Sequence, residues 1–205
     1  MTDHALAETR AWVERAVIGL QLCPFAKAPQ VKGQVRYATS EAIDADSLLS
    51  DLVDELKLLA GEAPDRIETT LLVHPCVFSA FEDHNDFLEV AEAALVALDL
   101  EGVIQIASFH PHYRFAGSDP DDITNATNRA PYPTLHLLRE ESIELRLARN
   151  ISFSSAVEPL APMPATWRFR TEDGAWIAGL AVNFLSLETK DYRNFIDFAN
   201  RFQIL

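Results

Sequence analysis

Two histidines occupy the same local position in the sequence, each at the end of an apolar run and each followed by proline. His74-Pro75 ends the run ETTLLVH, and His110-Pro111 ends the run VIQIASFH. If both runs are parallel strands of one sheet, their carboxyl ends meet at one edge, where open α/β sheets bind ligands. Imidazole at that edge can act as general base, general acid or metal ligand. We therefore predict His110 and His74 as catalytic residues; the alternative is that each ring only hydrogen-bonds backbone.

The segment after His110 carries many polar side chains in a short span. Asn128 and Arg129 precede a stiff Ala-Pro-Tyr-Pro stretch. An arginine fork held in this way suits a carboxylate or a phosphate. We predict Asn128, Arg129, Arg114 and Asp122 as ligand-binding residues. The alternative is structural, because Asp and Asn also cap turns and arginine can pair with an aspartate to fix a loop.

His136 is a further ligand-binding candidate on the segment that follows. His136 and Glu140 are spaced i, i+4, so they share one face of a helix if this segment is helical. That face points either toward the polar loop or toward solvent.

Cys23 is the third catalytic candidate because it precedes Pro24. If Pro24 opens a short helical turn, Cys23 is its N-cap, where a thiolate is stabilised. Pro29 ends any such helix early, and a buried, inert cysteine is the alternative.

A metal site is an alternative use of the same strand-end histidines. His74 and His110, with Asp121 or Asp122, have the ligand types of an open three-ligand zinc centre. No HxH strand motif or HExxH helix motif fixes these ligands. We therefore predict neither a metal nor a cofactor.

The elements that position these residues alternate between helices and strands. Their periodicity predicts helices over residues 6–20, 48–59 and 87–98, and strands over residues 34–39, 68–74 and 103–110. Strand, helix and strand of these lengths form a βαβ unit, whose strands are parallel. The sequence predicts an α/β core domain over residues 1–150, with a mostly parallel sheet flanked by helices.

The remainder of the chain has a different character. Residues 111–132 form a long polar loop, and Pro133 can open a fourth helix that runs to about residue 148. Residues 151–205 make up a C-terminal part with two predicted strands joined through Asp173-Gly174, a hairpin signal, and a last helix over residues 191–202. We expect this part to pack on the core.

Charge and cysteine content limit the partners. The chain of 205 residues has 31 acidic and 17 basic residues, a net charge of -14. Such a chain repels nucleic acid and anionic membranes, so we expect neither as a partner. Two cysteines give no disulfide framework, which favours the cytoplasm. The aromatic residues of the C-terminal part are compatible with a homodimer.

Four ordered segments resemble a known family. They are VIGLQLCPFA, HNDFL, IQIASFHPHYRFAG and TNRAPYPTLHLLREESI. These segments are similar to the bacterial domain-of-unknown-function family 1415 over about residues 5–147. The resemblance implies an α/β fold in a bacterial cytoplasmic protein and implies no reaction. Ala130 stands where the family more often has Ser, and the hairpin-like C-terminal segment departs from the helical tail of the family.

These features favour an enzyme that acts on a small anionic metabolite. In this hypothesis His110 is the acid or base, Arg129 binds the anion and Asn128 positions it. The alternatives are a ligand-binding or regulatory module without catalysis, a metal-dependent hydrolase, and a thiol enzyme built on Cys23.

Overall fold

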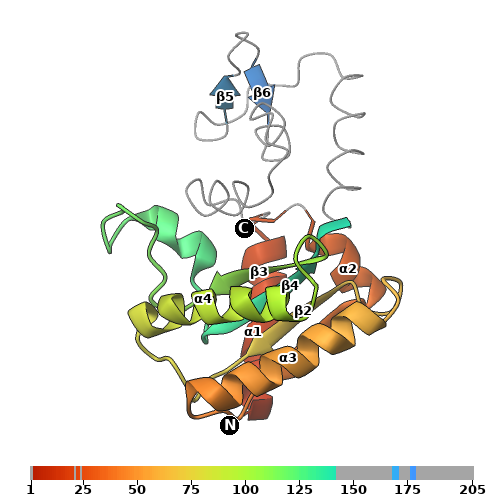
Figure 1. Ribbon diagram of the computed structural model, residues 1–205. Helices are drawn as coiled ribbons and strands as arrows, with labels where there is room; N and C mark the ends of the chain where they lie inside the picture. Colours follow the sequence, from red (N-terminus) through yellow and green to blue (C-terminus); the bar gives the residue numbers. More distant parts are fainter. Residues whose placement is uncertain (1, 21, 24, 142–167, 171–175, 179–205) are drawn as a thin grey trace.

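The structure is a computed structural model that describes residues 2–20, 22–23, 25–141, 168–170 and 176–178. In chain order its elements are α1 (Thr2–Trp12), the π-helical segment η1 (Val13–Ile18), α2 (Lys27–Lys32), β1 (Val35–Thr39), α3 (Ala45–Gly61), β2 (Thr69–Val73), α4 (Phe81–Ala97), β3 (Ile104–Phe109), the 3-10 helix η2 (Ile123–Asn128), β4 (Thr134–Arg139), β5 (Arg168–Arg170) and β6 (Trp176–Ala178) (Figure 1). The α/β class is confirmed.

The four-stranded sheet has the order β1-β2-β4-β3. β1 pairs with β2 in parallel, whereas β4 is antiparallel to both of its neighbours, β2 and β3. The prediction of a mostly parallel sheet was therefore wrong. β2 and β3 do run in the same direction, but β4 is inserted between them, so two of the three ladders are antiparallel.

β4 occupies residues 134–139 of the segment for which a fourth helix was predicted, so that prediction was wrong over these residues, whereas residues 142–148 lie outside the described part of the chain. Leu135 and Leu137 are fully buried on one face of the sheet, and the intervening His136 faces the other side. A short apolar run that is covered on both faces has no clear period and resembles a buried helix. The hydrogen bonds to strands on both sides decide the outcome, because pairing context outweighs local propensity.

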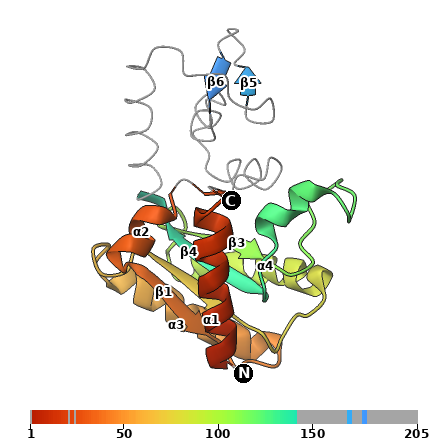
Figure 2. The same ribbon diagram turned by 180° about the vertical axis from the view of Figure 1, so that it is seen from behind.

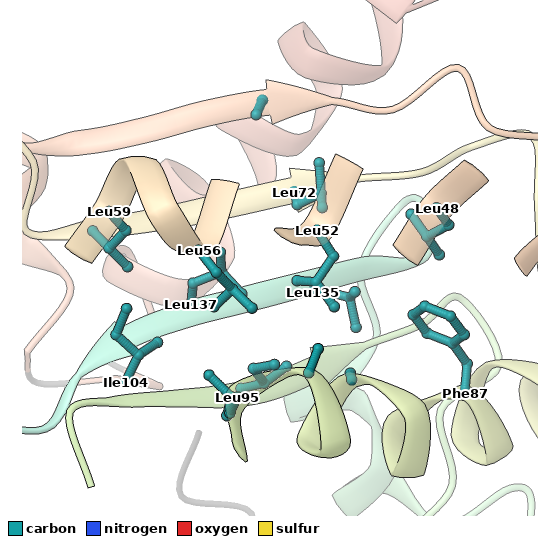
Figure 3. Packing of buried hydrophobic residues seen from close by; sticks show 14 of the residues in the cluster. Leu48, Leu52, Leu56, Leu59, Leu72, Phe87, Leu95, Ile104, Leu135 and Leu137 are labelled. Carbon is teal, nitrogen blue, oxygen red and sulfur yellow. The ribbon is translucent and has the colours of Figure 1, made fainter. Parts of the chain in front are cut away.

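The main core lies between the sheet and the helices α3 and α4 (Figures 1 and 3). The Asp44 side chain caps α3 by accepting the Ser47 N–H at 2.8 Å. The helix then turns one stripe toward the sheet: Leu48, Leu52, Leu56 and Leu59. In Figure 3 these leucines point at Leu72 of β2 and at Leu135 and Leu137 of β4. Burying such a side chain contributes about 1.5–3 kcal/mol.

The opposite face of the sheet is covered by α1, as Figure 2 shows. Val13 packs there with Leu71 and Phe109, and Trp12 meets Phe109 edge to face at 5.1 Å between ring centroids. The sheet is therefore covered on both faces, which explains why all residues of β2 and β3 are buried.

β5 and β6 pair antiparallel, from Arg168 opposite Ala178 to Arg170 opposite Trp176. The two predicted strands are confirmed over these residues. The turn at residues 173–174, the predicted helix over residues 191–202 and the domain boundary near residue 150 lie outside the described residues. In the part of the chain that the structure describes, no helix has the length and apolar character needed to cross a membrane.

Candidate functional site

Three histidine rings form a stack at the carboxyl edge of the sheet. The ring centroids of His74 and His84 lie 5.2 Å apart and nearly parallel, and those of His84 and His110 lie 5.3 Å apart. All three side chains have 0% of their surface exposed. We call these residues the imidazole cluster.

Each ring comes from a different element. His74 follows the last residue of β2, and His110 follows the last residue of β3. Because β2 and β3 run in the same direction, both rings reach the same edge of the sheet even though β4 separates the strands. His84 is the fourth residue of α4, and its ring lies against both of the others.

Backbone groups hold two of the rings in defined tautomers. The His110 Nδ1 accepts the His112 N–H at 3.0 Å, so its Nε2 carries the proton and donates to the Phe78 carbonyl at 3.1 Å. The His74 Nδ1 lies 3.3 Å from the Val77 carbonyl, which can only accept, so Nδ1 donates. The Nε2 of His74 therefore carries no proton and is free to accept one.

Three ring nitrogens of the cluster have no hydrogen-bond partner among the described residues. They are Nε2 of His74 and both nitrogens of His84. A buried polar atom without a partner costs about 1–3 kcal/mol of folding free energy. Such atoms are rare in native interiors and point to a ligand, an ion or water.

Burial keeps these imidazoles neutral. Desolvation lowers the pKa of His74 to about 4 and that of His84 to about 2, and neighbouring imidazoles add to both shifts. Desolvation also lowers the pKa of His110, although its hydrogen bond to the Phe78 carbonyl opposes the shift. At neutral pH the cluster therefore offers lone pairs and N–H groups but no positive charge.

Aromatic side chains cover the cluster. Phe81 contacts the His110 ring at 5.6 Å and the Tyr113 ring at 5.1 Å between centroids. Phe78 meets His74 edge to face at 6.3 Å and has a φ of 57°, a left-handed conformation that is uncommon for a bulky residue. The turn at Phe78 thus directs its carbonyl to His110 and its ring to His74.

The polar loop after His110 is braced by its own predicted site residues. Arg129 donates through Nε to the Tyr113 carbonyl at 3.3 Å and through Nη2 to the Pro120 carbonyl at 2.6 Å. The Asn128 side chain is buried and hydrogen-bonds Tyr113, and its carbonyl accepts the His110 N–H at 3.2 Å. Both residues connect the end of the loop to its beginning, which is the structural alternative considered from the sequence.

Replacing Arg129 tests this bracing role. The variant Arg129→Ala loses both bonds to backbone carbonyls, so we expect thermolysin to cleave the loop over residues 114–122 several-fold faster. Arg114→Ala is the matched control, because that side chain is exposed and forms a surface ion pair with Glu82 at 3.6 Å. Equal cleavage rates in the two variants, mapped by mass spectrometry, would contradict the bracing role.

The other predicted ligand residues lie at the surface or on the far side of the sheet. Asp122 caps η2 by accepting the N–H and hydroxyl of Thr124, which lowers the pKa of its carboxyl group. Arg114 is exposed beside Glu82 of α4. His136 is on a strand, not a helix, and faces away from the cluster; it lies 2.8 Å from the Thr69 hydroxyl. The prediction that His136 and Glu140 share one face of a helix is therefore wrong, because His136 lies on β4.

Cys23 lies between η1 and α2, and Ala26, not Cys23, is the N-cap of α2. α2 begins at Lys27, and the Ala26 N–H donates to the Cys23 carbonyl at 3.4 Å. The predicted turn opened by Pro24, with Cys23 as its N-cap, includes a residue outside the described ones, so the role of Cys23 stays a prediction. The described residues also contain no group of three or more His, Cys, Asp or Glu side chains arranged to hold a metal ion. Asp122, one predicted ligand, is instead used as the cap of η2.

His84 is the site residue that the sequence analysis missed. Its position carried a signal, since it precedes the buried Phe87 by three residues and so lies on the core-facing stripe of α4. A histidine on such a stripe is unusual, because it places a polar ring where the pattern requires an apolar one.

The chain matches a known protein family. The family model described as "Protein of unknown function (DUF1415)" matches residues 4–157, about three quarters of the chain. The chain belongs to this family. No curated protein and no solved structure matches the chain. The DUF1415 match includes all three histidines of the cluster, the braced loop and β4, so the candidate site lies wholly within the family region.

Proposed function

We propose that this protein is an enzyme that acts on a small anionic metabolite, with the imidazole of His74 as its general base or acid. The observation that supports the proposal is the set of three ring nitrogens, on two buried and adjacent histidines, that have no hydrogen-bond partner in the part of the chain that the structure describes. Replacing polar groups without partners by apolar ones usually stabilises a protein. Groups that lower stability in this way are typical of functional sites.

Among the site residues predicted from the sequence, His110 and Arg129 have structural roles and His74 becomes the proposed acid or base. His110 was the leading candidate, but both of its ring nitrogens are bonded to backbone, so it holds the Phe78 turn in place. Arg129 was the expected anion clamp, but its guanidinium is used on two carbonyls. His74 is better suited, because Val77 holds its Nδ1 proton and leaves Nε2 to accept one.

A ligand in the cluster would change the proton affinity of His74. An anionic group beside a desolvated imidazole favours the charged ring and so raises its pKa toward neutrality, where a general base is effective. The aromatic cover would exclude water during proton transfer, and we infer that it opens to admit the substrate.

A screen of small carboxylic and phosphorylated metabolites tests the proposed function. We expect at least one to raise the melting temperature, and the recovered compound to be chemically changed or to carry deuterium from D₂O, detected by NMR. The variant His74→Gln cannot titrate and should abolish the chemical change, whereas His4→Gln, an exposed control, should not. Binding without any change in the recovered ligand would instead assign a binding module, and undiminished turnover in His74→Gln would refute the role of His74.

A further inference from the structure

We propose that the first turn of α4 and the ring of His84 bind the carboxylate of a small monocarboxylic acid, which the protein takes up together with one proton. This inference rests on the proposed function, since it specifies the substrate class of the same site.

The first turn of α4 has the features of an anion site. The helix has 17 residues, and its N-cap, Ala80, has no side chain that could accept hydrogen bonds from the first turn. The first N–H groups of a helix have no partner within the helix, and the helix dipole adds partial positive charge at this end. Oxyanions bind at such ends through the backbone N–H groups.

The buried ring of His84 provides a second, independent observation in favour of a ligand at this helix end. Its ring is fully buried, and neither nitrogen has a hydrogen-bond partner among the described residues. Side chains on a helix tilt toward its N-terminus, so a ring at the fourth position lies over the first turn. Its contact with the His110 ring, which in turn contacts Phe81 at the first helical position, is consistent with this direction.

The charges around His84 restrict the ligand to one negative charge. The groups that face it are the neutral imidazoles of His74 and His110, while Glu82 and Asp83 of its own helix add negative charge at the exposed end. Among the described contacts no arginine reaches the cluster, since Arg114 lies beside Glu82 and Arg129 binds two carbonyls. A phosphate dianion in this setting would have no compensating cation. A monocarboxylate needs only one proton for neutrality.

The proton has a defined destination. A monocarboxylate and one proton from solvent enter together, and the proton binds a ring nitrogen of His84, which becomes an imidazolium beside the carboxylate. No covalent bond of the ligand changes in this step. The carboxylate and the proton bring opposite charges, so the net charge of the site does not change. Binding them together therefore avoids burying a lone anion in a low-dielectric interior.

The experiment uses the full chain, labelled with ¹⁵N at histidine, and acetate as the probe. At pH 7 we expect acetate to convert the ring of His84 to the imidazolium form in long-range ¹H–¹⁵N spectra, while inorganic phosphate and chloride leave it neutral. Between the pKa of His84 in the free protein and its higher pKa in the complex, affinity for the acetate anion should fall about tenfold for each unit rise in pH, because one proton is bound with the ligand. Calorimetry in buffers of different ionisation enthalpy should report uptake of one proton.

Three variants of α4 make the test specific to its first turn. Asp83→Asn removes a negative charge there and should tighten acetate binding about two- to fivefold, the range expected for one charge at a helix end. Glu89→Gln removes an exposed charge from the same helix two turns later and should have no such effect. His84→Leu should abolish the binding of acetate.

The outcomes separate this inference from the proposed function. A His84 ring that stays neutral at saturating acetate, or tighter binding of phosphate than of acetate, would overturn the carboxylate site. If His74→Gln still abolished turnover of another metabolite, the proposed function would stand without it. Imidazolium formation on acetate binding, with no turnover of any acid, would support the carboxylate site and refute the enzyme.

Discussion

The free energy of unfolding should fall steeply as the pH is lowered from 6.5 to 4. His74, His84 and His136 are kept neutral in the folded chain, with pKa values near 4, near 2 and near 4. In the unfolded chain each regains a pKa near 6.5, so below that pH the unfolded state binds more protons. Stability contributed by these neutral rings is therefore present above pH 6.5 and is lost as the pH falls toward the folded pKa values.

The size of this loss of stability determines the pH at which the chain unfolds in acid. Each pKa unit corresponds to about 1.4 kcal/mol, so by pH 4 the loss is on the order of 3 kcal/mol for each histidine. The combined loss from the three histidines is comparable to the whole free energy of unfolding of a domain, which is roughly 5–15 kcal/mol. We expect urea unfolding midpoints to fall continuously over this range, with acid unfolding complete near pH 4.

Single substitutions identify the cause of the acid unfolding. His84→Leu removes one titrating ring and two partnerless nitrogens, so its stability at pH 7 should be equal or higher and its pH dependence shallower. His4→Gln is the control, because His4 is exposed with 72% of its side-chain surface accessible. Identical slopes in His84→Leu and the unaltered chain would show that the cluster does not govern acid stability.

The sequence predicted those parts of the site that depend on local pattern. Buried strands are visible in ETTLLVH and VIQIASFH because β-branched and apolar residues run without interruption, and the histidine at each strand end follows directly. The direction of β2 and β3 also follows, since the connection through α4 is a crossover. These two facts bring His74 and His110 to the same edge of the sheet.

The parts that failed depend on contacts between distant segments. The helical stripe of α4 indicates that His84 faces the core, but only the packing of α4 against the strand ends brings its ring to those of His74 and His110. Arg129 illustrates the same limit, because a guanidinium suits a carboxylate as well as a carbonyl, and only the folded loop brings the Tyr113 and Pro120 carbonyls to it. Residue type therefore indicates what a group can bind, while tertiary packing determines what it does bind.

β4 gives the clearest case, and substitution of neighbouring leucines tests it. A helix over this segment would place Leu135 and Leu138 on one stripe and leave Leu137 off it, because helical neighbours are three or four residues apart. In the strand, Leu135 and Leu137 share the face toward α3 and α4, and Leu138 is half-buried on the other face. The two structures thus predict opposite orders of importance for Leu137 and Leu138.

Leu137→Ala should lower the free energy of unfolding by about 2–5 kcal/mol, the range for a buried leucine that leaves a cavity. Its side chain is 0% exposed and packs against the leucines of α3. Leu138→Ala should lower it by about 1 kcal/mol, a typical value for a point substitution. Chemical denaturation of both variants measures the difference. A larger loss for Leu138 than for Leu137 would contradict the central strand and, with it, the position of β4 between the two strands that carry His74 and His110.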